Sequence, residues 1–501
     1  MKLKAKFVSL TANCCIIHPD DYDTLAIGVH NIVEVTLGEG IRRVLQAITS
    51  IELVQQGEIL LPKGILVEGM KTDLVVDVDP GDSEEGTRIL GRMLSDQILS
   101  KEDVKTLIDL IYRENVTPLQ TASFVLYNHF HKIELDEVQN IAQAFCDTGN
   151  VLDFPGPVYD KHSTGGVPGN KVSLLIVPIL AAAGLLIPKT STKAITSASG
   201  TVDTMQALGC ETDFTVDETY EITKKSKACI ISGAKLGTAP VVDRIISNAA
   251  FPLGLDPPTL MLAGILSKKM AMGVDFMVLD IPVGRGAKFE TDQAGREYAR
   301  TFVNLASKVG ITAESGLTYG SVPVGHSIGP ALEAREALRA LIDVNKAPVS
   351  LVEKSTALAG IVLEMANISA LGKGKEYAFE ILRSGKAYEK MKQIIELQGG
   401  NPATKPEDIP VGKYTIQIDA PVNGWPVEIK NRALLQIARA AGAPSSPSAG
   451  IQLMTKKESV KKGDTIAVVY SESESYLDEV RGMIAKLKPI IVEGLLMERI
   501  K

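Results

Sequence analysis

The sequence predicts a multidomain α/β protein with four parts: a β-rich N-terminal domain, a helical domain, a central α/β domain with a mixed sheet, and a small C-terminal α+β domain. The length of 501 residues exceeds what one hydrophobic core usually covers, so several domains are expected. The spacing of apolar residues also changes along the chain, from short β-branched runs to helical spacing and then to alternating strands and helices.

The β-rich domain is expected over residues 1–85. There the short β-branched runs LAIGVHNIVEVTL and DLVVDVDP alternate with turn residues, as strands of a small sheet do. The turn residues Pro80, Gly81 and Asp82 mark the expected end of this domain.

The helical domain is expected over residues 86–158, and it is completed by a later segment at about 240–275. Three of its segments carry apolar residues three and four positions apart, namely SKEDVKTLIDLIYREN, TPLQTASFVLYNHFH and LDEVQNIAQAFCDTG. Ser100 with Asp103, and Thr117 before a proline, are suited to start the first two helices.

The central α/β domain is expected over residues 159–400, where strands, glycine-rich turns and helices alternate. DFMVLDIPV at 275–283 is its clearest buried strand, and the apolar run 172–188 is expected to be a buried helix because it is short for a membrane span. After the linker NPATKPEDIPVGK, the runs YTIQIDAPVNGWPVEI and DTIAVVYSES with one intervening helix predict an α+β domain over 411–501.

Composition and charge exclude several classes of protein. The 53 basic and 60 acidic residues give a net charge of −7, and the basic residues form no stripe interleaved with aromatic residues, so no nucleic-acid partner is expected. The five cysteines form no C-x-x-C pair and no zinc-type spacing with histidine, which indicates reduced thiols and no metal site. Because the N-terminus lacks a signal-peptide core and no run suits a bilayer span, we expect a cytoplasmic protein without membrane contact.

The segment DKHSTGGVPGNK at 160–171 is the first candidate binding loop. Its three glycines permit a tight turn with inward-pointing amides, and the N-terminus of the following helix adds partial positive charge, so an anion is favoured there. Lys161 and the hydroxyl groups of Ser163 and Ser173 are expected to complete a phosphate cage. A plain strand-to-helix loop is the alternative. The absence of Walker and Rossmann fingerprints argues against ATP and NAD.

The segment KTSTKAITSASGTVD at 189–203 is the second candidate loop. It carries seven hydroxyl side chains in fifteen residues, which is more than helix capping requires. Hydroxyl groups bind phosphate or ribose without adding charge, and Ser191 and Thr201 are the candidate phosphate ligands. A serine- and threonine-rich helix cap is the alternative.

Two further segments carry candidate ligand-binding residues. In DPPTLMLAGILSKK at 256–269, Asp256 before two prolines is typical of an N-cap, which alone can explain it. Gly264 and Lys268 lie one helical turn apart and therefore share a helix face. The missing side chain of Gly264 leaves the backbone accessible beside the cation of Lys268, as the binding of a planar heterocycle would require. Lys268 also suits a cation that stabilises the helix C-terminus. In GRGAK, Lys288 is either a second anion ligand or a solvated turn residue.

Taken in order, these segments resemble the thymidine and pyrimidine nucleoside phosphorylases. The phosphate loop of that family is matched at 160–166, its second loop at 191–203 and its base-side helix at 262–269. GPALEAREA at 329–337 resembles a further signature of the family. Several separate motifs in the same order make the resemblance specific.

Two features make the chain look like the archaeal AMP phosphorylases. One is the extra β-rich N-terminal segment, and the other is LDP at 255–257, where the arginine of the pyrimidine enzymes is not evident. The resemblance implies that AMP and phosphate react to adenine and ribose 1,5-bisphosphate, with CMP and UMP as further substrates. It also implies a homodimer or a larger homo-oligomer, and no cofactor, because inorganic phosphate is a co-substrate.

The site residues of the family are carried over one by one. The resemblance implies AMP contacts at Gly166, Thr192, Lys193, Ala194, Ile195, Thr196, Ser197, Thr201, Gly264, Lys268 and Lys288. It implies that Asp256 donates a proton to the leaving base. The family's serine on the base-side helix is Gly264 here, so its hydroxyl contact is lost or replaced by backbone or water.

Three other interpretations stay open. Lys161 in KHST matches the wording of the pyrimidine nucleoside phosphorylases, which would cleave nucleosides. SASGTVDTMQALG also resembles the loop of anthranilate phosphoribosyltransferases, but the sequence has no evident acidic cluster for a magnesium ion on pyrophosphate. A regulator without catalysis would bind AMP and release no base.

Overall fold

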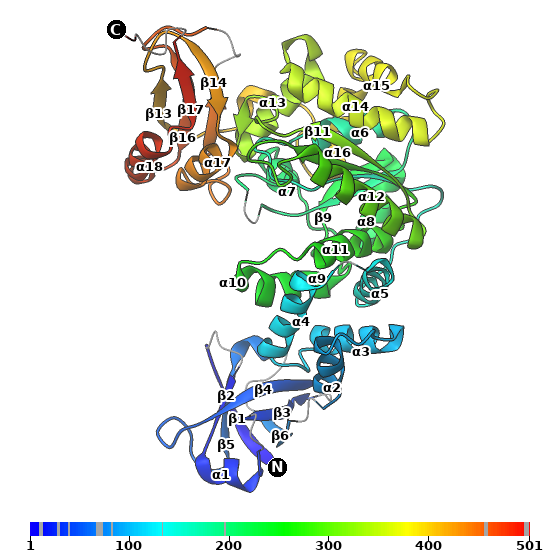
Figure 1. The fold of residues 1–501 in the computed structure, drawn as a ribbon, viewed down its shortest axis with the longest axis vertical. Coiled ribbons are helices and arrows are strands. Elements are labelled where there is room, and N and C mark those ends of the chain that lie inside the picture. Colours follow the sequence, from blue (N-terminus) through cyan, green and yellow to red (C-terminus); the bar gives the residue numbers. More distant parts are fainter. Residues whose placement is uncertain are drawn as a thin grey trace. The chain divides into compact units, whose positions relative to one another are not determined.

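The computed structural model describes residues 1–9, 14–27, 31–38, 41–66, 74–81, 84–132, 134–194, 197–454, 459–494 and 500. The chain forms two compact units, of which the first contains residues 1–151 and 238–271 and the second contains residues 152–237 and 272–501 (Figure 1). Within the described ranges, none of the helices combines the length and apolarity that crossing a bilayer requires.

A closed barrel of six strands opens the first unit, with the strand order β1-β5-β2-β4-β3-β6. The strands are β1 Lys2–Val8, β2 Cys14–Ile17, β3 Ile32–Thr36, β4 Arg42–Thr49, β5 Glu58–Pro62 and β6 Leu74–Pro80, with the short helices α1 Pro19–Thr24 and η2 Lys63–Ile65 between them. Alternate residues such as Val33 and Val35 fill the interior because successive side chains of a strand point to opposite faces.

Helices form the rest of the first unit. They are α2 Glu84–Leu94, α3 Lys101–Tyr112, α4 Pro118–Phe130, α5 Leu135–Cys146, α9 Pro240–Ile245, the π-helical turn η3 Ile246–Ala250, α10 Phe251–Leu253 and α11 Pro258–Ala271. The predicted starts at Ser100 and Thr117 are confirmed, since each side chain accepts a hydrogen bond from the amide three residues later. Helix α11 packs against α5 and α4, which brings residues 258–271 to the helices that precede residue 151.

Parallel strands form the centre of the second unit. They are β7 Tyr159–Ser163, β10 Phe276–Val283 and β11 Thr312–Tyr319 in the order β11-β10-β7, together with the pair β8 Ile187–Ser191 and β9 Ala228–Ser232. The predicted buried strand at 275–283 is confirmed by β10. The sheet expected to be mixed is parallel at every described pairing of these five strands, because helical crossovers connect them.

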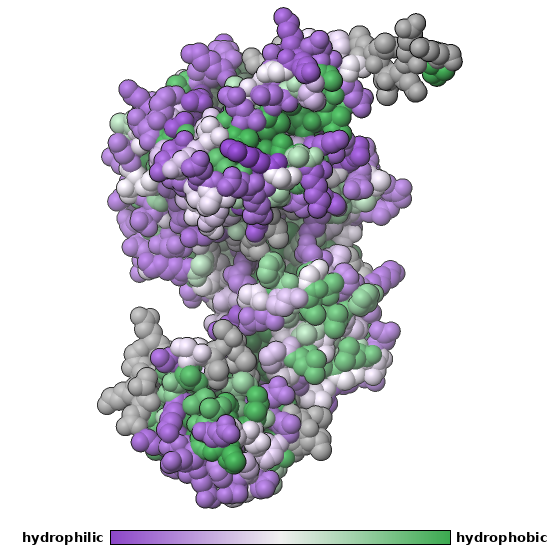
Figure 2. Space-filling view, turned by 90° about the vertical axis from the view of Figure 1, so that its left-hand side faces the viewer, coloured by the Kyte–Doolittle hydropathy of each residue, from purple (hydrophilic) through white to green (hydrophobic). Residues whose placement is uncertain are grey.

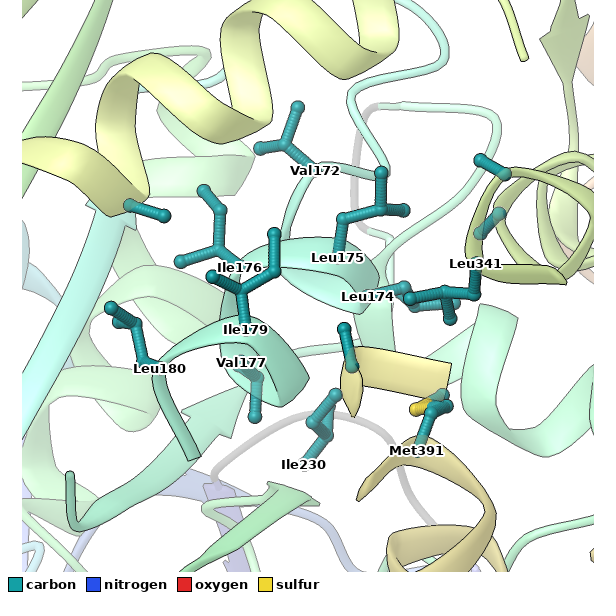
Figure 3. Packing of buried hydrophobic residues seen from close by; sticks show 14 of the residues in the cluster. Val172, Leu174, Leu175, Ile176, Val177, Ile179, Leu180, Ile230, Leu341 and Met391 are labelled. Carbon is teal, nitrogen blue, oxygen red and sulfur yellow. The ribbon is translucent and has the colours of Figure 1, made fainter. Parts of the chain in front are cut away.

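The helices of this α/β region are α6 Ser173–Ala182, α7 Thr201–Ala207, α8 Val216–Ser226, α12 Asp292–Lys308, α13 Pro330–Ile342, α14 Val349–Met365, α15 Gly374–Arg383 and α16 Lys386–Leu397, with the 3-10 turns η4 Val344–Lys346 and η5 Pro406–Asp408. Helices α13, α14, α15 and α16 pack against α6. Residues 173–181 of α6 are all buried, and Figure 3 shows Leu174 and Ile176 among Leu341 and Met391 of other helices. The helix predicted over 172–188 ends at Ala182.

The last part of the second unit is an α+β domain. It contains β13 Tyr414–Asp419, β14 Trp425–Ile429, α17 Asn431–Ala440, β15 Gly450–Leu453, β16 Thr465–Ser471, α18 Glu474–Leu487 and β17 Ile490–Glu493. The predicted intervening helix is confirmed by α17, whereas α18 was not predicted. The two-residue strand β12 Ser327–Ile328 pairs with β15, which joins this domain to the α/β region through one sheet. Figure 2 shows separate apolar patches on one face of the chain.

Candidate active site

The glycine-rich loop runs from the end of β7 at Ser163 to the start of α6 at Ser173, which is buried. Gly166 has a φ of +86°, and a Cβ atom there would lie 3.1 Å from the backbone nitrogen of Lys288. The loop therefore touches the GRGAK turn, and the structure brings Gly166 and Lys288 together. Only glycine permits both the positive φ and this approach without strain.

The side chain of Asp280 on β10 binds two residues of the glycine-rich loop. Its carboxylate is fully buried and accepts hydrogen bonds from Ser163 Oγ at 2.7 Å, Asn170 Nδ2 at 3.2 Å and Thr318 Oγ1 at 2.6 Å. Two loop residues are thus held by one carboxylate, which positions the loop relative to the sheet.

Two lysines neutralise this carboxylate. Lys354 Nζ of α14 lies 2.9 Å from Asp280 Oδ2, and Lys161 Nζ of β7 lies 4.0 Å from the same oxygen. Burial by itself raises the pKa of Asp280, but Lys354 and then Lys161 outweigh it and hold the pKa below its ordinary value. Asp280 therefore stays ionised.

Strand β7 carries a second buried carboxylate, that of Asp160. Asp160 Oδ1 accepts a hydrogen bond from the backbone nitrogen of Lys161 at 2.7 Å and lies 3.5 Å from Lys189 Nζ. Lys161, Lys189 and Lys354 are thus buried, and each lies within ion-pair distance of a buried aspartate. The two cationic side chains at Asp280, next to the glycine-rich loop, favour an anion there.

The hydroxyl-rich loop is shaped by Asp203 in the first turn of α7. Its carboxylate accepts hydrogen bonds from the backbone nitrogens of Ala194 at 2.7 Å and Gly200 at 2.8 Å. Ser197 Oγ donates to a carbonyl of the same loop at 3.0 Å, so this hydroxyl is used internally.

The other predicted residues of this loop differ in exposure. Thr192 and Lys193 are exposed, whereas Ser191 at the end of β8 and Thr201 at the start of α7 are partly buried. Ile195 and Thr196 lie outside the described residues.

The base-side helix α11 places its predicted residues in the first unit. A Cβ atom at Gly264 would lie 3.1 Å from Val242 Cγ1, and Lys268 Nζ donates to Asp243 Oδ1 at 2.7 Å. Both residues therefore face α9, which confirms the predicted shared face. Val242 fills the space beside Gly264, so close helix packing explains the glycine there and the expected gap for a heterocycle is not present at that atom.

Asp256 precedes the same helix and is exposed. The helix begins at Pro258, so Asp256 lies two residues before the first helical residue and not immediately before it, as an N-cap would. A proline suits the first helical position because its missing N–H needs no partner there.

The segments described above lie within regions that match known proteins. The family model described as "Glycosyl transferase family, a/b domain" matches residues 155–388, which include both loops and Asp280. The AMP phosphorylase of Thermococcus kodakarensis is 40% identical over 100% of this chain and 99% of its own length. The AMP phosphorylase of Methanosarcina barkeri is 43% identical over 90% of this chain and 89% of its own length.

The chain belongs to the AMP phosphorylase family. Among solved structures, the anthranilate phosphoribosyltransferase of Thermus thermophilus superposes with a TM-score of 0.53 at 18% identity, covering 62% of this chain and 99% of that one. At that identity the likeness shows the fold alone. It places this member of the AMP phosphorylase family on an α/β scaffold that also occurs outside the family.

In this member of the AMP phosphorylase family, the sequence did not reveal the residues that contact the glycine-rich loop through Asp280 or form Asp280's own surroundings. Asp280, Thr318 and Lys354 lie on three elements far apart in the chain, and their segments VLDIPV, GLTYG and VEKSTAL carry no binding motif. A signal was present, because an ionisable residue inside a fully apolar strand or on the inward face of a helix must be paired. Asn170 was read only as part of the glycine-rich loop.

Proposed function

We propose that this protein is an AMP phosphorylase, which transfers the 5-phosphoribosyl group of AMP from adenine to inorganic phosphate. The products are adenine and ribose 1,5-bisphosphate, and CMP and UMP are further substrates. The observation that carries the proposal is the pair of buried lysines, Lys161 and Lys354, at the carboxylate that holds the glycine-rich loop, in a chain that matches an AMP phosphorylase over its whole length.

In this proposal, phosphate binds at the glycine-rich loop to Lys161, Ser163 and Ser173. Ser191 and Thr201 of the hydroxyl-rich loop add contacts to phosphate and ribose. A phosphate oxygen attacks C1′ of AMP while the bond from C1′ to the base breaks, through a state in which the sugar carries positive charge. Lys161 and the hydroxyl groups of the two loops favour the attacking dianion.

The electron pair of the broken bond stays on the base, which then takes a proton. Asp256 supplies this proton, and Lys288, whose backbone touches the loop at Gly166, contacts AMP. Since phosphate is the co-substrate, no cofactor is required. We also propose that the protein works in the cytoplasm as a homodimer or a larger homo-oligomer.

One incubation series tests the proposal. The protein is incubated with phosphate and, separately, with AMP, CMP, UMP, uridine and thymidine, and free base and sugar phosphate are followed. We expect base release from the nucleotides and only in the presence of phosphate. Release from uridine and thymidine alone would instead select a pyrimidine nucleoside phosphorylase, which the KHST motif at Lys161 favours. AMP binding without any base release would select a non-catalytic regulator.

A further inference from the structure

We propose that Lys354 is a positioning residue for phosphate: it balances the charge of Asp280 while Ser163 and Lys161 turn from Asp280 to the attacking phosphate. The inference rests on the proposed function, because it assigns phosphate to the glycine-rich loop. It concerns a residue on α14, outside both loops, that touches the reacting groups only through Asp280.

The hydrogen bonds of Ser163 show that a partner exchange is required. A hydroxyl group has one hydrogen to donate and two lone pairs to accept. Ser163 Oγ donates its hydrogen to Asp280 Oδ2 at 2.7 Å, and it accepts from Asn170 Nδ2 at 3.1 Å and the backbone nitrogen of Gly165 at 3.3 Å. All three positions are in use, so Ser163 can donate to a phosphate oxygen only by releasing Asp280.

The two lysines differ in their distance from the Asp280 carboxylate. Lys354 Nζ lies 2.9 Å from Asp280 Oδ2, whereas Lys161 Nζ lies 4.0 Å from that oxygen, at the limit of an ion pair. Both side chains are at least nine-tenths buried. The ion pair of Lys161 with Asp280 is therefore the weaker of the two, and in our proposal Lys161 turns from Asp280 to phosphate while Lys354 keeps its contact with the carboxylate.

Asp280 needs a remaining cation during this exchange. If Ser163 and Lys161 both turned to phosphate and Lys354 were absent, a fully buried carboxylate would keep, from the part of the chain that the structure describes, only the hydrogen bonds from Thr318 and Asn170. An uncompensated buried charge is strongly unfavourable, and it would also repel the phosphate dianion. Without Lys354, Lys161 and Ser163 would therefore stay with Asp280, and phosphate would bind weakly.

Lys354→Met tests the inference, since methionine has a similar length and no charge. We expect the KM for phosphate to rise by at least about tenfold, while the KM for AMP changes by less than about threefold. Phosphate binding measured by calorimetry should weaken by the same factor, which gives a readout without turnover. Lys354→Arg keeps the charge and should stay within about threefold of the parent protein.

Lys375→Met is the matched control, because Lys375 forms an exposed ion pair with Glu353, the residue next to Lys354. Its loss should leave both KM values within about twofold. The double variant Asp280→Asn with Lys354→Met removes both buried charges. It should bind phosphate at least about threefold more tightly than Lys354→Met alone, because no carboxylate then competes for Lys161.

Equal increases in both KM values, or a double variant that binds phosphate no better than Lys354→Met, would overturn the inference and leave Lys354 a purely structural residue. If Lys354→Met does not fold, as shown by its thermal unfolding, the double variant is compared with Asp280→Asn alone. Equal phosphate affinity of the two supports the inference, because Lys354 then acts only through Asp280, and weaker binding by the double variant overturns it. If the parent protein releases no base from AMP, the proposed function fails. If it does and Lys354→Met keeps its phosphate affinity, only this inference fails.

Discussion

At the scale of single residues, burial separates the two carboxylates that the proposed reaction needs. Asp280 is fully buried and keeps its charge because two lysines face it. Asp256 is exposed at the start of the base-side helix. Asp280 is thus held as an anion that orients the loop, whereas Asp256 is the residue that we propose as the proton donor.

Asp256→Asn tests the acid. Asparagine keeps the size and the hydrogen-bonding shape but has no proton to transfer, so the leaving base would depart as an anion. We expect the kcat for AMP to fall by at least about 100-fold, while the KM for AMP changes by less than about threefold. Steady-state kinetics of adenine release measures both. An unchanged kcat would exclude Asp256 as the proton donor.

The candidate site residues that share one short segment could be predicted from the sequence, whereas those on distant elements could not. Lys161 and Ser163 were found because they share one short segment with three glycines. Asp280 and Lys354 were not, because their significance arises only when β10 and α14 bring them to the same loop. A single sequence shows that a charged residue lies in an apolar run, but not which distant segment pairs with it.

At the scale of elements, the glycine-rich loop connects a strand of the parallel sheet to a buried helix. It starts from β7 in the parallel sheet and ends at α6, whose residues 173–181 are all buried in the core (Figure 3). A firmly packed base lets the loop keep its geometry without a ligand, which reduces the entropy lost on binding.

Gly166→Ala tests the contact between this loop and the GRGAK turn, with Gly165→Ala as the matched control. Both glycines have a positive φ, +86° and +77°, so each alanine costs about 1 kcal/mol of stability. Only the Cβ atom at 166 meets a neighbour, the backbone of Lys288. We expect Gly166→Ala to lower kcat/KM for AMP by at least about tenfold more than Gly165→Ala does.

Equal losses of kcat/KM in the two variants would show that the contact with Lys288 has no functional importance. Thermal unfolding of both variants checks that their stability loss is similar.

Helices and strands were predicted best where the local sequence has a clear apolar spacing and capping residues. The helices at 101–112 and 118–130 carry apolar spacing and capping residues, and they begin where predicted. The run 172–188 is apolar except for Ser173, so it has no periodicity that separates helix α6 from strand β8. The parallel pairing of the central strands was missed because strand direction depends on the crossovers and not on the strand sequences.

At the scale of the whole molecule, the C-terminal domain forms hydrogen bonds and an ion pair with turns and loops of the α/β region. Asn431 Nδ2 donates to the carbonyl of Gly320 at 2.8 Å, and Arg285 in the GRGAK turn pairs with Glu428 at 2.9 Å. Arg439 Nη1 donates to the carbonyl of Ser197 in the hydroxyl-rich loop at 3.3 Å. The domain therefore contacts two of the segments that are proposed to bind AMP, the GRGAK turn and the hydroxyl-rich loop.

Glu333 of α13 lies next to this junction, where Gly329 approaches Ala449 of the C-terminal domain. Burial raises the pKa of Glu333 from 4.5 to about 7, and the nearby Glu336 and Asp203 add to the increase although Lys171 opposes it. Between these two values the folded chain retains a proton that the unfolded chain has released. Stability therefore falls as the pH rises from 4.5 to about 7 and then levels off.

Glu333→Gln should remove this loss, because glutamine stays neutral and can still accept the hydrogen bond from the backbone nitrogen of Gly329. We expect its stability relative to the parent protein to increase by about 3 kcal/mol between about pH 5 and about pH 8. Denaturant unfolding at several pH values measures the difference. The exposed Glu297→Gln is the control and should show a difference independent of pH. A flat difference for Glu333→Gln would mean that Glu333 is ionised in the folded protein, with Lys171 as its counter-ion.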